Sequence, residues 1–193
     1  MGENVCVLGA DGKLHFGLSF GSLSYAADFP TSYSTPVLGT DNFIVAAITG
    51  TKKIIGGWEP GALHQKELTS LDCDSIDDIH YFDGHYFLKC TAGRGMKCYV
   101  SDDLDNFTLC STEFFPEYYS DGYYVSTRVR PDNVGVFQYA KYENMGNPTE
   151  MIIDDRGMTA QKIKLYKLNS TFVIAVEARY TRLTYFYYTT KDF

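Results

Sequence analysis

The sequence predicts an all-β protein, from its aromatic content, its lack of helix-forming segments and a turn pattern that recurs along the chain. Its 193 residues include 16 Tyr and 13 Phe but one Trp, and aromatic side chains favour pleated, half-buried strands. Only the segment MTAQKIKL could form a helical turn or two, and its flanks read better as strand. The length suits a single domain with one sizeable core.

An Asp or Asn followed by a small turn residue and an aromatic-rich strand occurs five times. The copies read DGKLHF, DNFIVA, DGHYFL, DGYYVS and NSTFVI, and begin at Asp11, Asp41, Asp83, Asp121 and Asn169. Asp-Gly and Asn-containing pairs tolerate positive φ, so each copy can close a tight hairpin. The mean spacing of about forty residues is the length of a propeller blade.

The third repeat shows the predicted blade most fully. It reads IHYF, HYFLKC, MKCYVS and DDLDNFTLC, which gives four short strands separated by turns. A four-stranded meander cannot cover both of its own faces, so it must stack against copies of itself. We therefore predict a single small β-propeller domain of about five blades, at roughly 1–36, 37–72, 73–113, 114–160 and 161–193. A β-sandwich with Asp-Gly turns is the alternative.

Charge and cysteine content limit the function classes. The formal net charge of −7 disfavours nucleic-acid binding. The start of the chain predicts no signal peptide, and no apolar stretch predicts a membrane span. The odd number of five cysteines points to a reducing compartment. Cys90 and Cys98 could face each other across a hairpin and form a disulfide, although free thiols are the favoured interpretation.

One segment resembles a known type of propeller blade. In YVSDDLDNF, Ser101, Asp103 and Phe107 fit a shortened Asp-box, the S-x-D-x-x-x-[WF] turn of sialidase-like propellers. With the preceding IHYFDGHYFLKC, residues 76–110 resemble blades of bacteriophage tail and other virion-associated propellers, whereas the other repeats lack the Ser-x-Asp pair. The resemblance implies a structural turn, in which Ser and Asp bond the turn backbone and the aromatic side chain packs between blades.

The acid-rich run LDCDSIDDIH contains the weak catalytic candidates Asp74, Asp77 and Asp78. Glycoside hydrolysis needs two carboxyl groups about 5 Å or roughly 6.5 to 9.5 Å apart, on either side of one bond. Glu117, at the start of the fourth repeat, is the candidate partner acid. The alternative is a solvated acidic face, which is the commoner use of such a run.

No cofactor or metal is expected from the motifs. The acid run lacks the Gly and trailing Glu of a calcium loop, the cysteines lack a zinc-binding spacing, and no glycine-rich phosphate loop occurs. A sialidase would need an arginine cluster. Arginines occur near second-strand hairpins, at Arg128, Arg130, Arg179 and Arg182.

Binding is easier to support than catalysis. The candidate binding residues are the aromatic residues Trp58, Tyr118 and Tyr119, which can stack on sugar rings or on protein side chains, together with Arg94. The alternative is that the aromatic residues belong to the core, which is the commoner use of alternating aromatic positions. The sequence favours a non-enzymatic structural or binding module, associated with a bacteriophage virion or tail and engaging another virion protein or a host-surface glycan. Alternatives are a small propeller-type glycoside hydrolase and an inhibitor of host proteins. The expected location is the virion, or the host cytoplasm during assembly.

Overall fold

The computed structural model confirms the all-β prediction. It describes residues 5–9, 11–17, 20–28, 37–38, 44–48, 53–59, 62–153, 159–169, 171–179 and 183–190. No α-helix occurs among these residues. The helical elements that it describes are short 3-10 turns at Phe20–Ser22 (η1) and Tyr142–Asn144 (η3).

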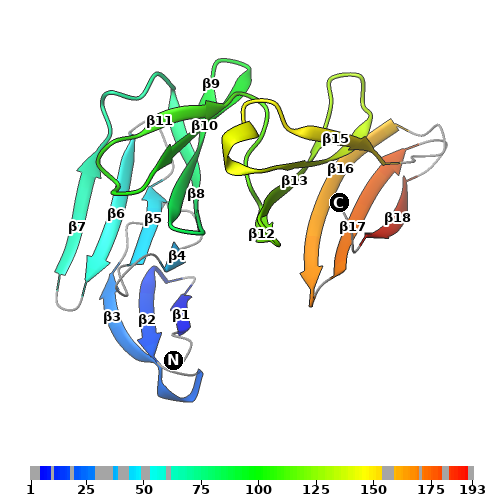
Figure 1. The fold of residues 1–193 in the computed structure, drawn as a ribbon. Helices are drawn as coiled ribbons and strands as arrows, with labels where there is room; N and C mark the ends of the chain where they lie inside the picture. Colours follow the sequence, from blue (N-terminus) through cyan, green and yellow to red (C-terminus); the bar gives the residue numbers. More distant parts are fainter. Residues whose placement is uncertain are drawn as a thin grey trace. The chain divides into compact units, whose positions relative to one another are not determined.

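The strands of the described residues form five antiparallel sheets that follow one another along the chain (Figure 1). The first sheet contains β1 (Val5–Leu8), β2 (Lys13–Gly17) and β3 (Ser24–Asp28). The second contains β4 (Val37–Leu38), β5 (Ile44–Ile48), β6 (Ile54–Glu59) and β7 (Ala62–Glu67). The third contains β8 (Ser75–Phe82), β9 (His85–Ala92), β10 (Gly95–Ser101) and β11 (Thr108–Ser111).

The last two sheets have the same simple connectivity. The fourth contains β12 (Tyr118–Ser120), β13 (Tyr123–Val129), β14 (Gly135–Ala140) and β15 (Thr149–Ile152). The fifth contains β16 (Thr159–Leu168), β17 (Thr171–Arg179) and β18 (Leu183–Thr190). In every sheet the strand order in space is the order in the sequence, so each sheet is a meander.

Contacts within the chain divide it into two compact units, Met1–Phe115 and Pro116–Phe193. The first unit contains the first three sheets, and the second unit contains the fourth and fifth. The arrangement of the sheets into a propeller within a single domain stays a prediction.

The predicted turns are confirmed where the structure describes them. Asp83 and Gly84 have φ values of 51° and 88°, and Asp121 and Gly122 have values of 53° and 83°. Two consecutive residues with positive φ form the turn that matches the right-handed twist of a hairpin. Asn169 also has positive φ, at 56°, and in the Asp11-Gly12 turn only the glycine does, at 78°. The turn of the DNFIVA copy lies outside the described residues.

Each unit contains its own hydrophobic cluster between neighbouring sheets. The cluster of the first unit includes Ile55, Leu68, Leu71, Ile76, Ile79, Tyr86, Leu88, Cys90 and Tyr99. The cluster of the second unit includes Val125, Phe137, Ile153, Ala160, Leu165, Phe172, Ile174, Val176 and Ala178. The fifth sheet therefore buries one face against the fourth.

The prediction that Cys90 and Cys98 could face each other is wrong. The turn between β9 and β10 has two central residues, Gly93 and Arg94, and this register places Cys90 opposite Lys97. Opposed residues share a face, and the next residue along the strand points to the other face. Both cysteines are free and buried, and burial raises the pKa of each thiol.

Candidate binding surface

The outer face of the fifth sheet, the face turned away from the fourth sheet, contains a hollow with a volume of about 410 Å³. Side chains from β16, β17 and β18 line it: Lys162, Lys164, Tyr166, Ala175, Glu177 and Tyr187. These six residues are called the fifth-sheet surface below. All of them lie within the second unit.

Strand β17 explains why this sheet has two different faces. Its even-numbered residues, Phe172, Ile174, Val176 and Ala178, are buried, whereas the intervening residues are half-buried. Successive side chains of a strand point to opposite faces. One set therefore packs into the core, and the other forms the floor of the outer face.

The register between strands places the residues of the fifth-sheet surface. Lys164 lies opposite Ala175, which in turn lies opposite Tyr187 on β18. Because the side chain of Ala175 is small, the surface is depressed at this residue, between the longer side chains of Lys164 and Tyr187. In the neighbouring row Lys162 lies opposite Glu177. The hollow therefore has an apolar floor with aromatic and charged side chains around it.

The tyrosines of this surface face solvent. Tyr166 is 45% exposed and Tyr187 is 69% exposed, and both lysines are exposed. Within the described part of the chain, neither Lys162 nor Lys164 forms an ion pair. Exposed aromatic rings with an apolar body and a hydroxyl group are suited to stacking with partial hydrogen bonding. The lysines add donors for an anionic group.

The acids of the predicted catalytic run bond to their own sheet. The Asp74 carboxylate accepts a hydrogen bond of 2.6 Å from the backbone N–H of Gly93. Asp77 accepts one of 2.8 Å from the Thr91 hydroxyl, and the ladder between β8 and β9 shifts register at this residue. The Asp78 carboxylate accepts from the backbone N–H that follows it, at 3.0 Å. These contacts stabilise the pairing of β8 with β9 and the turn between β9 and β10.

Two further residues of this run, His80 and Asp72, also have local partners. The Asp78 carboxylate lies 3.4 Å from Nε2 of His80. At the start of the run, Asp72 pairs with Lys97 at 2.5 Å, and the hydrogen bond and charge of that ammonium lower the pKa of Asp72. Their partners come from the third sheet itself.

The candidate partner acid Glu117 belongs to the second unit. Its carboxylate accepts a hydrogen bond of 3.3 Å from the Thr127 hydroxyl on β13. The pairing of Glu117 with an acid of the run across one glycosidic bond stays a prediction.

Tyr118 and Tyr119, two of the predicted binding residues, make contacts within the second unit. The Tyr118 hydroxyl donates to the carbonyl of Leu165 at 3.3 Å, and its ring lies 6.0 Å from that of Phe172. Tyr119 packs against Tyr124 with 4.9 Å between ring centroids. Both side chains are half-buried. These contacts connect the fourth sheet internally and to the fifth.

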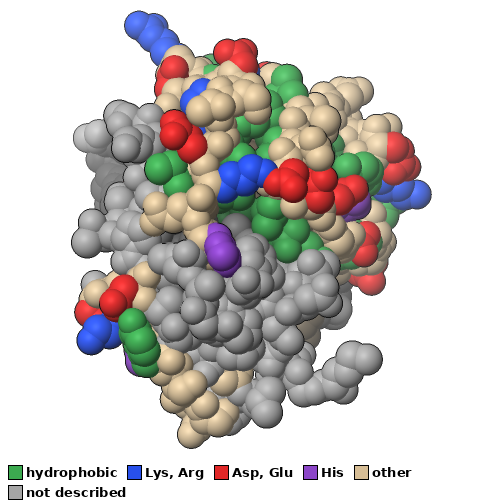
Figure 2. Space-filling view, turned by 90° about the vertical axis from the view of Figure 1, so that its left-hand side faces the viewer, with side chains coloured by type: hydrophobic (Ala, Val, Ile, Leu, Met, Phe, Trp, Pro, Cys, Tyr) green, Lys and Arg blue, Asp and Glu red, His purple; other side chains and the backbone are tan. Residues whose placement is uncertain are grey.

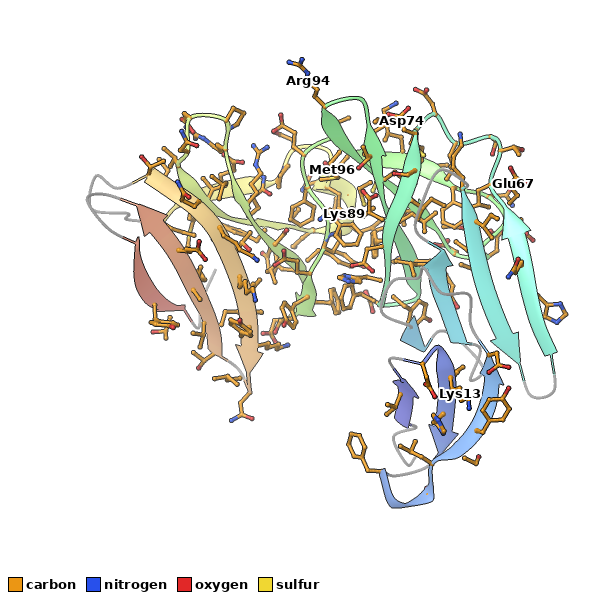
Figure 3. All side chains as sticks on the ribbon, turned by 180° about the vertical axis from the view of Figure 1, so that it is seen from behind. Lys13, Glu67, Asp74, Lys89, Arg94 and Met96 are labelled. Atoms are coloured by element: carbon orange, nitrogen blue, oxygen red, sulfur yellow. The ribbon has the colours of Figure 1, made fainter. Side chains whose placement is uncertain are left out.

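The other two predicted binding residues lie in the first unit. Arg94 is exposed at the tip of the β9–β10 hairpin and projects away from the sheet (Figure 3). Trp58 lies on β6 opposite Leu63, but its side chain lies outside the description. Their part in binding stays a prediction.

Ser101 and Asp103, which the sequence predicts to form an Asp-box, lie in a turn after β10 that is held by several hydrogen bonds. The Asp103 carboxylate accepts from the backbone N–H groups of Asp105 and Asn106, both at 2.8 Å, and from the Ser101 hydroxyl at 2.9 Å. The backbone and side-chain hydrogen bonds of Asn106, followed by that of Ser101, lower the pKa of Asp103. Phe107 packs against the hydrophobic cluster of the first unit. Such bonds are typical of a side chain that organises its own turn.

A lysine of the second sheet forms a hydrogen bond and an ion pair with this turn. Lys66 on β7 donates to the carbonyl of Leu104 at 3.1 Å and pairs with the carboxylate of Asp105. Among the described side chains on the face that Figure 2 shows, acidic and basic groups lie next to each other. The charges near this turn therefore stabilise the contact between sheets.

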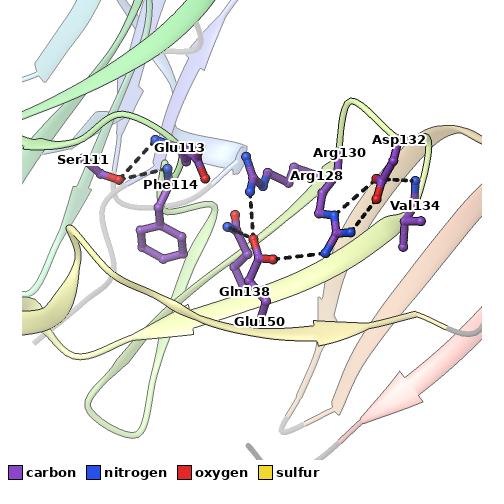
Figure 4. Close-up of polar contacts among 9 residues, drawn as sticks. All are labelled: Ser111, Glu113, Phe114, Arg128, Arg130, Asp132, Val134, Gln138 and Glu150. Atoms are coloured by element: carbon purple, nitrogen blue, oxygen red, sulfur yellow. Dashed lines mark hydrogen bonds and ion pairs between the residues drawn. The ribbon is translucent and has the colours of Figure 1, made fainter.

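Two of the arginines considered for a sialidase have acidic partners (Figure 4). Arg128 donates to Glu150 at 2.9 Å, and the buried Gln138 donates to the same oxygen at 2.8 Å. Arg130 bonds Asp132 through Nε at 3.2 Å and lies 3.8 Å from Glu150. This network links β13, β14 and β15.

Among the described residues, no group of three or more His, Cys, Asp or Glu side chains is placed to hold a metal ion. Nor does this part of the chain contain a helix long and apolar enough to cross a membrane. No known protein family matches the chain, and no curated protein matches its sequence. The evidence for a binding site is therefore the arrangement of the residues on the fifth-sheet surface.

Sequence reasoning did not single out the fifth-sheet surface. A signal was present in KIKLYK, where Lys162, Lys164 and Tyr166 alternate with apolar residues. Alternation places these three side chains on one face of a strand. Tyr187 is about twenty residues further along the chain, and only the pairing of strands brings it to the row of Lys164 and Ala175.

Proposed function

We propose that this chain is a non-enzymatic binding module, built from propeller-type blades, that binds a host-surface glycan as part of a bacteriophage virion. The observation that carries the proposal is the fifth-sheet surface, where exposed Tyr166 and Tyr187 lie beside two lysines around the low floor at Ala175. The glycan would stack on the tyrosines and bond to the charged groups.

The size of the hollow supports a ligand of one or two sugar rings. Its volume of about 410 Å³ falls within the range of about 300 to 1,000 Å³ that is usual for small-molecule sites. Carbohydrate rings present a flat, weakly apolar face together with many hydroxyl groups. An aromatic side chain can cover that face while its own polar tip stays hydrated.

The acid run supports a binding role over hydrolysis. A glycosidase needs two carboxyl groups that face one substrate bond. Asp77 instead bonds Thr91 on the neighbouring strand β9, and Asp74 bonds Gly93 in the turn between β9 and β10. These hydrogen bonds stabilise the edge of the third sheet, where β8 lies.

The five meanders and their recurrent turns support propeller-type blades. Burial of Lys162, Lys164 and Glu177 without complete pairing would be costly, because charged groups lose their hydration. The exposure of Lys162 and Lys164 therefore supports the use of this face as a binding surface.

Glycan binding is tested by screening the purified protein against immobilised glycans, with Tyr187→Ala and Tyr166→Ala as variants. We expect each variant to lose affinity by about tenfold or more. Tyr25→Ala is the matched control, because Tyr25 is also exposed, at 56%, but lies on β3. Equal binding by all four proteins would place the glycan elsewhere, and the absence of binding to any glycan would refute the proposal.

Virion association has a separate test. Mass spectrometry of purified particles of the source virus should detect this chain at a constant ratio to the other structural proteins. A chain that is abundant in infected cells but missing from particles would refute this part of the proposal.

A further inference from the structure

We infer that the glycan bound at the fifth-sheet surface is acidic, with a carboxylate that is held by Lys164. The inference rests on the proposed function and adds the chemical class of the ligand. It follows from the distribution of charge on this face and from the register of the three strands.

The fifth-sheet surface differs in charge from the whole chain. The protein has a formal net charge of −7, but the hollow is lined by Lys162 and Lys164 against the single acid Glu177. An anion approaching an acidic protein is attracted to a local excess of positive charge. This hollow offers such an excess beside aromatic rings.

The two lysines are not equivalent. Lys162 lies directly opposite Glu177, so part of its charge is offset by the neighbouring carboxylate. Lys164 lies opposite Ala175, which has no polar side chain. Glu177 is only a diagonal neighbour of Lys164, at the roughly 7 to 8 Å that separates such pairs. Lys164 is therefore the cation with most of its charge left for a ligand.

The row through Ala175 sets the position of the sugar. Lys164, Ala175 and Tyr187 lie on three successive strands, so the lysine and tyrosine backbones are separated by two strand spacings, about 9.6 Å. A sugar ring can lie over the alanine with one face on Tyr187 and its carboxylate toward Lys164. Glu177, at the next row, accepts hydrogen bonds from sugar hydroxyl groups.

Glu177 also limits how much negative charge the site accepts. A second anionic group near the row of Lys162 would approach the Glu177 carboxylate, and like charges at this separation repel each other. The site should therefore prefer a sugar with one carboxylate over a polymer with several sulfate groups per repeat.

The test compares glycans that differ only in the carboxylate. The probes are 3′-sialyllactose against lactose, and trigalacturonate against its methyl ester, with dextran sulfate as a non-specific polyanion. We expect each acid to bind at least tenfold more tightly than its neutral partner, and added salt to reduce this preference. Dextran sulfate should bind no better than the acids.

Variants of Lys164 decide which residue holds the carboxylate. Lys164→Gln should bind the acid no better than the neutral glycan, and Lys164→Arg should keep most of the preference because it keeps the charge. Lys13→Gln, an exposed lysine of the first unit, is the control and should behave as the unchanged protein. A thermal unfolding curve for each variant checks that it is folded.

The outcomes separate the inference from the proposed function. Equal affinity for acidic and neutral glycans overturns the inference and leaves glycan binding standing. An acid preference that survives Lys164→Gln also overturns it. If no glycan binds, the proposed function itself fails, and binding to a virion protein that Tyr187→Ala abolishes would identify the surface as a protein interface.

Discussion

Replacing Phe172 with Ala should remove a large part of the stability of the second unit. Phe172 is 1% exposed, and its ring lies 6.2 Å from that of Phe137 and 6.0 Å from that of Tyr118. Truncating a fully buried Phe to Ala costs about 3 to 5 kcal/mol, through lost burial and the cavity that remains. Typical domains unfold with about 5 to 15 kcal/mol, so this one change is a large fraction of the total.

Urea unfolding followed by circular dichroism measures this loss. With a slope near 2 kcal/mol per molar urea, the unfolding midpoint should fall by about 1.5 to 2.5 M. Tyr187→Ala is the control, because an exposed side chain changes stability by only about 0.5 kcal/mol. A midpoint shift for Phe172→Ala as small as that of the control would show that Phe172 does not lie in a packed core.

The same experiment tests whether the two units unfold together. Trp58 is the only tryptophan and belongs to the first unit, so its fluorescence reports on that unit, whereas Phe172 belongs to the second. A single domain should show the same midpoint shift by fluorescence and by circular dichroism. An unchanged fluorescence transition would show that the units unfold independently, against the single-domain prediction.

Three further predictions follow from local contacts. The pKa of Asp103 is lowered in the folded protein, so its stabilising effect is present above an unfolded pKa of about 3.9 and is lost as the pH falls. The Asp103→Asn variant should therefore have a lower thermal unfolding midpoint than the unchanged protein at pH 7, and nearly the same midpoint at pH 2. Buried Cys90 and Cys98, whose pKa values are raised by burial, should resist iodoacetamide at pH 8 until urea is added, and labelling of the native protein would contradict their burial. Lys162 and Lys164 should be acetylated as fast as free lysine, and protection of both would show that another surface covers the fifth sheet.

The hairpin turns could be predicted because they depend on a few adjacent residues. In the Asp83-Gly84 and Asp121-Gly122 pairs, both residues have positive φ, which few other residue types adopt at low cost. The strands beside these turns were predictable for the same reason. Once the turn is fixed, the alternation of apolar and polar residues determines which face is buried.

Contacts between strands could not be predicted to the same degree, because they depend on register. The interpretation of Cys90 and Cys98 failed by one residue of register, since Cys90 lies opposite Lys97. The acid run shows the same limit. Its sequence shows a cluster of carboxylates, but only the pairing of β8 with β9 brings Thr91 to Asp77 and Gly93 to Asp74.

The fifth-sheet surface could not be predicted from any one of its strands. The apolar run TFVIAVE is typical of a strand covered on both faces, which argues against an open surface on β17. The neighbouring strands change this interpretation, because they place Lys164 and Tyr187 on either side of Ala175. An apolar floor between a cation and an aromatic ring is unsuited to packing against another apolar sheet, since the ammonium would lose its hydration. The same floor is suited to a ligand that has both an apolar face and a charge, as an acidic sugar does.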